Sequence, residues 1–330
     1  MELGIYFDLR NPPPWRQEWT RVYARTLELC AEFDRGGGHS VWFTEHHLYE
    51  DGYLPQPLTF ASAVAARTTN VRIGTSIMIA PFRPAAQIAE EAAIVDIVSN
   101  GRLDLGLGAG NSREEYALFS VDYPHRLSAL LERIRELRAI WREAEVTPPP
   151  VQDPLPIWGG VFRERGAREI GRMGERLLCA DAQVVAWYLE GLVEGGHDPA
   201  QAVVAGPANV FLTDDPERDW PRVAPHVAWQ RDTYNRHGAR ANGKIPPIDP
   251  ERWRERGLSS SLTLNGFVVD TPEEAAKTIL ARTAGLPVSN LHIWGSVASV
   301  DEDLAEHNVE LAVTRLAPLL KAAGKPATDV

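Results

Sequence analysis

Val41-Trp42-Phe43-Thr44-Glu45-His46-His47 is a short apolar run that ends in a carboxylate and two adjacent imidazoles. Its apolar part is typical of a strand that is buried in a parallel sheet. Polar groups just past the carboxyl end of such a strand lie where α/β proteins place their chemistry. Because side chains alternate along a strand, we expect Glu45 and His47 to face one way and His46 the other.

Segments with strand character alternate with helical segments along the whole chain. The predicted strands are residues 3–7, 41–44, 71–80, 103–108, 156–160, 176–180, 203–212 and 291–294. The predicted helices include 18–35, 58–69, 84–99, 124–142 and 163–173. Thr271-Pro272-Glu273-Glu274 predicts a further helix start, with Thr271 as the cap and Glu274 as its reciprocal partner. Eight alternating strands predict an α/β fold of the (β/α)8 TIM-barrel type, with an open doubly wound sheet as the alternative.

The length of 330 residues suits a single barrel domain over 1–330. The region from about 214 to 270 is too long for a simple connection and predicts an insertion between strands seven and eight. A helix around 222–237 and then a polar, proline-containing loop are expected there. The tail 322–330 is expected to be frayed.

Composition excludes several classes of partner. The formal net charge of −11 leaves no basic field for nucleic acid, and no apolar run is long enough for a membrane helix. The start of the chain has strand character and neither the basic start nor the apolar segment of a signal peptide. Cys30 and Cys179 lie far apart and are expected to be buried thiols, which fits a cytoplasmic protein.

Two glycine-rich segments follow predicted strands. Gly106-Leu107-Gly108-Ala109-Gly110 lacks the spacing of a dinucleotide fingerprint, so it either permits a tight turn or lets a flat ring approach the backbone. Gly159-Gly160, followed by Arg163 and Arg165 at a helix start, predicts a phosphate seat or, alternatively, a solvated helix face. We expect no metal site, because His46 and His47 point to opposite sides of one strand and no second His/Asp cluster matches them.

The order of these motifs resembles the bacterial luciferase-like flavin monooxygenases. The most recognisable segment is Ser99-Asn100-Gly101-Arg102-Leu103 with the glycine-rich run that follows it. The other matching segments are 42–47, 72–75, 83–84 with 89–90, 154–160 and 271–274. The resemblance covers most of the chain and implies a (β/α)8 barrel.

The resemblance also implies a chemistry. FMN, as FMNH2 supplied by a separate flavin reductase, would react with O2 to give a C4a-peroxyflavin that oxygenates a small organic substrate. His46 would stabilise the peroxyflavin or carry its proton, Glu45 would hold His46 or the substrate pocket, and His47 would have a smaller part. The residues expected to bind the cofactor are Ser76, Gly108, Ala109, Gly159, Gly160, Val161 and Arg163. A homo-oligomer, most simply a dimer, is expected.

The sequence departs from the family pattern at the phosphate. The luciferase α subunit has an arginine where this chain has Ala109, and its strand-five serine and threonine correspond roughly to Arg163 and Gly166. We therefore expect Arg163 or Arg165 to hold the phosphate. Two alternatives stay open: an F420-dependent oxidoreductase of the same fold, and a non-catalytic flavin-binding protein.

Two further expectations concern the pocket. Relatives have a non-proline cis peptide at the end of strand three, and the matching bond here is Ser76–Ile77. An apolar pocket wall is expected from Trp15, Tyr49, Tyr53, Phe82 and Trp294, which suits an organic substrate. The sequence does not decide between hydroxylation, Baeyer–Villiger insertion and aldehyde oxidation.

Overall fold

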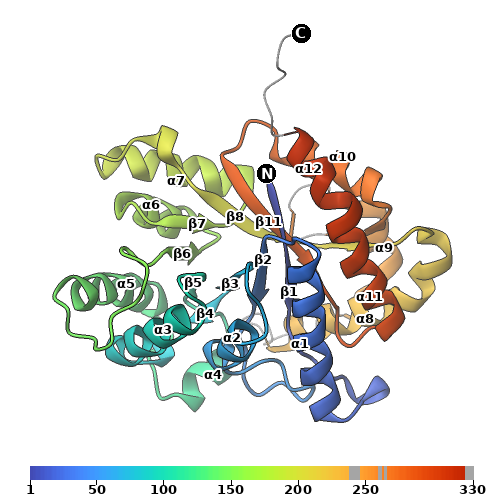
Figure 1. Ribbon diagram of the computed structural model, residues 1–330, viewed down its shortest axis with the longest axis horizontal. Helices are drawn as coiled ribbons and strands as arrows, with labels where there is room; N and C mark the ends of the chain where they lie inside the picture. Colours follow the sequence, from blue (N-terminus) through green and yellow to red (C-terminus); the bar gives the residue numbers. More distant parts are fainter. Residues whose placement is uncertain (238–245, 259–261, 264–265, 324–330) are drawn as a thin grey trace, which may run out of the picture.

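The computed structural model describes residues 1–237, 246–258, 262–263 and 266–323. Within these ranges, the main sheet has the strand order β3-β2-β1-β11-β8-β7-β6-β5-β4, and β3 also pairs with β5. All of these pairings are parallel. Since β3 and β4 share one place in the sheet, it closes into an eight-stranded barrel surrounded by helices (Figure 1). The predicted TIM barrel is confirmed.

The bounds of the elements follow the chain. The barrel strands are β1 (Glu2–Phe7), β2 (Ser40–Phe43), β3 (Arg72–Thr75), β4 (Met78–Ile79), β5 (Leu103–Gly108), β6 (Ile157–Gly160), β7 (Arg176–Leu178), β8 (Val204–Ala208) and β11 (Val288–Trp294). The helices are α1 (Trp19–Arg35), α2 (Pro57–Ala65), α3 (Ala85–Val98), α4 (Arg113–Leu118), α5 (Arg126–Arg142), α6 (Glu164–Arg172), α7 (Ala182–Glu194), α8 (Pro216–His237), α9 (Pro250–Arg256), α10 (Pro272–Thr283), α11 (Glu302–Leu311) and α12 (Ala317–Ala323). Short segments are η1 (Pro13–Trp15), η2 (Ala80–Phe82), η3 (Pro199–Gln201) and the π-helical η4 (Ala312–Leu316). Helices α4, α7, α9, α11 and α12 were not predicted from the sequence.

Two predicted strands are broken in the structure. The third, expected over 71–80, divides into β3 and β4 at the cis peptide bond Ser76–Ile77, and this confirms the predicted bond. The seventh, expected over 203–212, ends at Ala208, and Val210–Leu212 forms β9, which pairs with β10 (Val268–Asp270) in a separate sheet. Asn209 causes this break, because its side chain donates to the carbonyls of Thr263 and Gly266 and accepts from the indole of Trp294.

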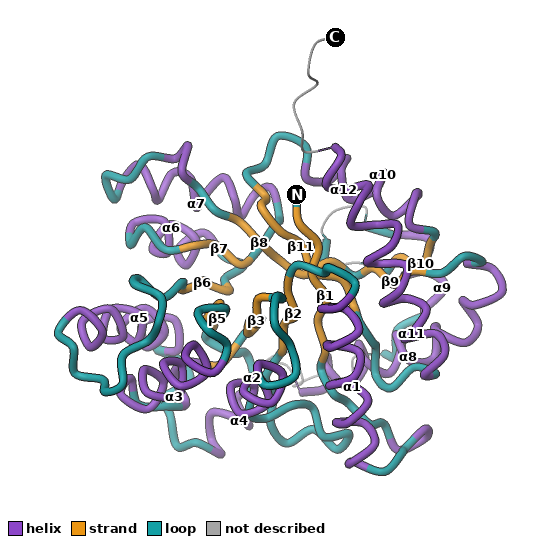
Figure 2. The backbone as a smooth tube through the Cα atoms, in the orientation of Figure 1, coloured by secondary structure: helices purple, strands orange, loops and turns teal. Residues whose placement is uncertain are grey.

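The insertion lies on one side of the barrel (Figure 2). It starts with β9 at Val210, slightly before the predicted 214, and continues through α8, α9 and β10. Helix α8 begins at Pro216, earlier than the predicted 222, and part of the predicted polar loop, 238–245, lies outside the described residues. A buried arginine attaches α8 to the barrel. Arg10 donates through Nε to Asp51 at 2.8 Å and through Nη1 to the carbonyl of Gln230 at 3.0 Å.

The predictions for the C-terminal part of the chain, from Thr271 onward, are confirmed in part. Thr271 caps α10 as predicted by accepting from the amide of Glu274 at 3.4 Å, but the Glu274 carboxylate contacts Lys277 instead of returning to the cap. Of the tail expected to be frayed, residues 322–323 complete α12 and 324–330 lie outside the described residues. None of the described helices has the length and apolar character needed to cross a membrane.

Candidate active site

A cavity of about 550 Å³ opens at the carboxyl ends of the barrel strands. Of the predicted site residues, those that line it are Glu45, His46, Ser76, Gly108, Ala109, Gly160, Val161 and Arg163. They come from the ends of β2, β3, β5 and β6, which sequence analysis placed at one rim. His47 and Gly159 do not line the cavity. His47 is buried beside it, and a side chain at Gly159 would collide with Ile170 of α6, so this glycine faces the outer helix.

His46 is held by a carboxylate that sequence analysis did not identify. Its Nδ1 lies 2.8 Å from Oε1 of Glu115, and the same oxygen accepts from the amide of His47 at 2.8 Å. Glu115 is 1% exposed, so this carboxylate acts without competition from bulk water. A carboxylate only accepts hydrogen bonds, so Nδ1 carries the proton. Nε2 has no hydrogen-bond partner among the described residues and is the nitrogen left for the cavity.

Of the two roles expected for Glu45, holding His46 is wrong, because its described contacts go to other residues; as a lining residue it keeps the predicted role at the pocket. Its Oε1 accepts from Arg83 at 2.8 Å and lies 2.8 Å from Nε2 of His47, while Oε2 accepts from the amide of Ile79 at 2.7 Å. Glu45 therefore joins the end of β2 to β4. Glu45 and His47 contact each other, whereas His46 contacts Glu115. All three residues follow the end of β2 at Phe43, so the alternation expected along the strand does not place them.

Ile77 provides a packed surface inside the cavity. A side chain at either Gly108 or Gly160 would collide with Ile77. The two glycines leave the space that Ile77 occupies, and this is a physical reason for small residues at the ends of β5 and β6. The cavity wall at this point is apolar and close to backbone, which suits a flat ring.

The side of the cavity across the barrel from His46 is cationic. Arg163 and Arg165 line it at the start of α6, and Arg126 reaches it from α5. Arg163 stands at the N-cap of α6 without a side-chain cap, so the first amides of the helix point outward unpaired by a cap. Within the described residues, Arg163 and Arg165 make no ion pair, whereas Arg126 lies over the Tyr123 ring at 4.3 Å. This arrangement can bind an anion.

Only one of the five aromatic residues expected in the pocket wall lines the cavity. That residue is Tyr53, whose ring centroid is 4.7 Å from that of His46. The other four do not line it, and each packs against a ring that is not part of the lining: Tyr49 against His237, Phe82 against Phe119, Trp15 against His226 and Trp294 against Tyr6. Tyr49 also lies behind His46, with ring centroids 5.0 Å apart.

Three residues that matter for the site, Tyr234, Arg126 and Glu115, were missed from the sequence. Tyr234 of α8 accepts from Asn111 at 2.9 Å and packs edge-on to His46, so the insertion supplies part of the wall. Arg126 stands on the helix preceding β6, where no motif pointed to it. Ser112-Arg113-Glu114-Glu115 has the capping-box spacing and could have revealed α4. Ser112 does cap Glu115, but the Glu115 side chain goes to His46, which the spacing alone does not indicate.

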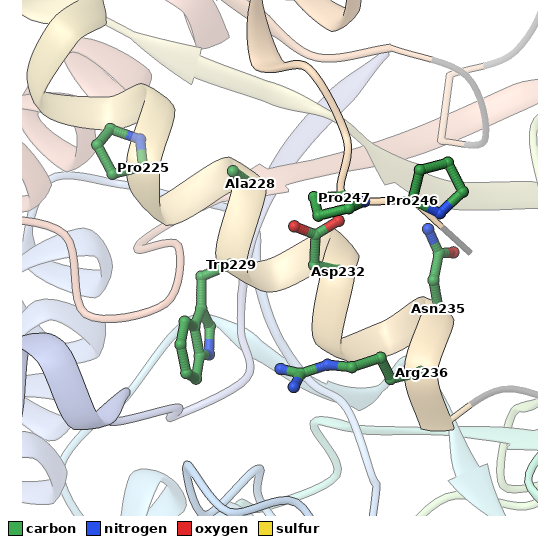
Figure 3. A pocket seen from close by; sticks show the side chains of 8 residues that line it. All are labelled: Pro225, Ala228, Trp229, Asp232, Asn235, Arg236, Pro246 and Pro247. Atoms are coloured by element: carbon green, nitrogen blue, oxygen red, sulfur yellow. The ribbon is translucent and has the colours of Figure 1, made fainter. Parts of the chain in front are cut away.

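A second cavity of about 400 Å³ lies away from the rim, between α8 and residues 246–247 (Figure 3). Figure 3 shows Asp232 extending from α8 toward Pro247, and this carboxylate accepts from the amide of Ile248 at 2.8 Å. Trp229 on the same helix donates to Asp51 at 2.7 Å. Trp229 and Asp232 of this second cavity thus attach α8 to neighbouring segments of the chain. None of the predicted site residues lines this cavity.

Comparison with known proteins identifies the family. The family model of luciferase-like monooxygenases matches residues 1–289. The chain belongs to this family. Its members are flavin-dependent monooxygenases or oxidoreductases, as the motifs predicted.

Individual relatives fall into both cofactor classes. The chain is 33% identical over 159 residues to the oxygenase component of a flavin-dependent trigonelline monooxygenase from Acinetobacter baylyi, covering 43% of this chain and 44% of that protein. It is 29% identical over 197 residues to an F420-dependent glucose-6-phosphate dehydrogenase from Amycolatopsis mediterranei, covering 53% and 59%. The matches thus span about half the length of these relatives.

A solved structure extends the likeness to the whole fold. The monooxygenase RslO1 from Streptomyces bottropensis superposes with a TM-score of 0.79 at 20% identity, over 96% of this chain and 99% of that one. At this identity the likeness concerns the fold alone.

Proposed function

We propose that this chain is the oxygenase of a two-component monooxygenase, which uses FMNH2 and O2 to oxygenate a small organic substrate. The observation that carries the proposal is the oriented His46, with Nδ1 bonded to Glu115 and Nε2 left for a cavity whose other side is cationic. A separate reductase would supply the reduced flavin, and we expect a homodimer, which sedimentation of the purified chain would test.

The residues present suit FMN. The phosphate is a dianion, and the guanidinium groups of Arg126, Arg163 and Arg165 with the uncapped start of α6 provide its complement. The ring would be held by Ser76, Ile77, Gly108, Ala109, Gly160 and Val161. When bound, reduced flavin supplies the electrons that activate O2.

His46 then has a defined task. Because Glu115 fixes the Nδ1–H tautomer and the ring orientation, Nε2 can take a proton from the reacting group or return one to it. Tyr53 and Tyr234 place aromatic surface around His46 and limit the access of water. Glu45 lines the same cavity, and its bonds to His47, Arg83 and the amide of Ile79 hold the end of β2 in place beside His46.

The second candidate is an F420-dependent oxidoreductase. The three arginines of the cationic side would also suit a cofactor whose tail carries anionic groups in addition to one phosphate. In that case His46 would serve proton transfer that accompanies movement of a hydride, without O2.

Oxygen separates the two candidates. The purified chain is mixed anaerobically with FMNH2 and then with O2 in a stopped-flow spectrometer, and in parallel with F420 and candidate alcohols. A transient species before the spectrum of oxidised FMN returns, together with O2 uptake, is the expected result. Reduction of F420 without O2 uptake would replace the monooxygenase proposal with the second candidate. Tight FMN binding with neither reaction would indicate a flavin-binding protein.

A further inference from the structure

A serine and a histidine meet where the cavity borders the interior of the barrel. Ser76 lines the cavity after β3, and its Oγ is 3.0 Å from Nε2 of His292 on β11. His292 pairs in register with Gly4 of β1, two residues before the Tyr6–Trp294 pair, so it lies deeper in the barrel than the rim. Its side chain has no exposure to solvent.

Among the described residues, the side chain of His292 has one polar contact, the hydroxyl of Ser76. Its ring stacks on Trp42 with centroids 4.8 Å apart, and the Tyr6 ring meets it edge-on at 5.3 Å. Nδ1 is buried and has no hydrogen-bond partner among the described residues. Burial lowers the pKa of His292 to about 3, so the imidazole is neutral under working conditions and has a single N–H.

Two tautomers are possible, and they use Ser76 differently. With the proton on Nδ1, this N–H would be a buried donor without an acceptor, and Nε2 would accept a hydrogen bond from the Ser76 hydroxyl. With the proton on Nε2, His292 donates to Ser76 Oγ, and only an acceptor lone pair on Nδ1 is left unpaired. Buried donors without a partner are rarer than buried acceptors without one, so the second tautomer is favoured.

We propose that Ser76 donates its hydroxyl hydrogen to an acceptor atom of the flavin ring, a carbonyl oxygen or an unprotonated ring nitrogen, and that the Nε2–H of His292 aims it there. This inference rests on the proposed function for the identity of the ring, and it holds for FMN and F420 alike. Because His292 already occupies a lone pair of Oγ, the hydroxyl hydrogen is directed away from the histidine. Ser76 touches the cofactor, and His292 is a positioning residue.

The tautomer is tested on the chain without cofactor. ¹⁵N-histidine NMR of the folded chain should show His292 as the neutral Nε2–H form at every pH measured around neutrality. The signal is assigned by its loss in His292→Phe or, if that variant does not fold, in His292→Gln. A neutral Nδ1–H form would overturn the proposal.

The contact with the ring is tested by binding. Quenching of FMN fluorescence should show that Ser76→Ala weakens FMN roughly threefold to tenfold, the scale of one net hydrogen bond. Ser62→Ala is the matched control, because the Ser62 hydroxyl donates to the Leu58 carbonyl of its own helix α2 and Ser62 does not line the cavity. Adding His292→Gln to Ser76→Ala should cause no further loss, since His292 acts through Ser76.

Each other outcome has a separate meaning. If the wild-type chain binds FMN and Ser76→Ala binds it equally well, the inference is overturned and the proposed function stands. If the two substitutions lower FMN affinity independently and additively, His292 has a structural role and the inference is overturned. If the wild-type chain binds neither FMN nor F420, the proposed function fails and this inference fails with it.

Discussion

The two sides of the cavity are built differently. On the side of His46, the polar groups are buried and bonded to one another: Glu115 is 1% exposed, Glu45 is 2% exposed, and each makes two or more contacts below 3 Å. On the other side, Arg163 and Arg165 are exposed and lack partners among the described residues, and Arg126 is only half-buried.

The difference indicates a division of labour. A group that transfers a proton has to be held in one tautomer and one direction before the reaction, and buried carboxylates achieve this. A group that grips an anion has to reach outward and close on it, and a guanidinium on a flexible side chain suits that task. Substitutions on the first side should therefore change the rate, and substitutions on the second should change cofactor affinity.

The largest expected effect is that of His46→Ala. Coupled product formation should fall by roughly two to four decades, the usual scale for removing a general acid–base, while affinity for reduced FMN stays nearly unchanged. Hydrogen peroxide released per FMNH2 should rise, because oxygen is no longer transferred productively. Product and peroxide are measured together. His47→Ala is the control and should lower product formation less. Full product formation in His46→Ala together with its loss in His47→Ala would contradict the assignment of His46.

Asp8 is a buried carboxyl directly after the last residue of β1, and it makes stability depend on pH. Burial is the main cause that raises the pKa of Asp8 from 3.8 to about 7, and its Oδ2 has no partner among the described residues. An acid whose pKa is higher in the folded chain than in the unfolded chain retains its proton longer when folded. Its contribution is therefore most favourable below about pH 4 and is lost as pH rises toward about 7.

Asp8→Asn should remove this dependence. Relative to the variant, the wild-type chain should lose up to roughly 4 kcal/mol of unfolding free energy between about pH 4 and pH 8. Urea titrations of both chains at several pH values measure the difference, which cancels the contributions of the other acids. A difference that is constant with pH would show that Asp8 titrates normally.

Arg163→Ala tests the cationic side. Loss of one charge-assisted contact, about 1.5–3 kcal/mol, should weaken FMN by roughly one to two decades and leave riboflavin unaffected, because only FMN carries the phosphate. Fluorescence titration gives both constants. Arg282→Ala, at an exposed arginine of α10, controls for the change in net charge. Equal weakening of the two flavins would place the phosphate elsewhere.

The smallest effect is expected from Glu115→Gln, which keeps the shape and removes the charge. A neutral acceptor holds Nδ1–H of His46 less strongly, so kcat should fall about tenfold while FMN affinity stays unchanged. Glu114→Gln is a closely matched control, since Glu114 is its exposed neighbour on α4. A loss of FMN affinity without a change in kcat would reverse the division of labour between the two sides.

Local chemistry along the chain was sufficient to predict the barrel and one rim. The runs at 3–7, 41–44 and 103–108 are apolar enough to be recognised as buried parallel strands, and the polar residues after them mark the rim. Thr271-Pro272 begins α10 as predicted because a cap is satisfied within one turn of helix. The resemblance to the family also pointed to the cis bond Ser76–Ile77, which propensity does not reveal.

Only the tertiary structure decided which groups meet across the barrel. Glu115 is 69 residues from His46, and Tyr234 reaches the cavity from the insertion. Likewise, the break at Asn209 depends on carbonyls of residues 263 and 266, more than fifty positions away. Strand and helix signals arise from neighbouring residues, and the sequence by itself therefore determined the fold and the place of the site. The partners of His46, Ser76 and Asn209 are chosen by packing between distant segments, whose relative positions no local pattern contains.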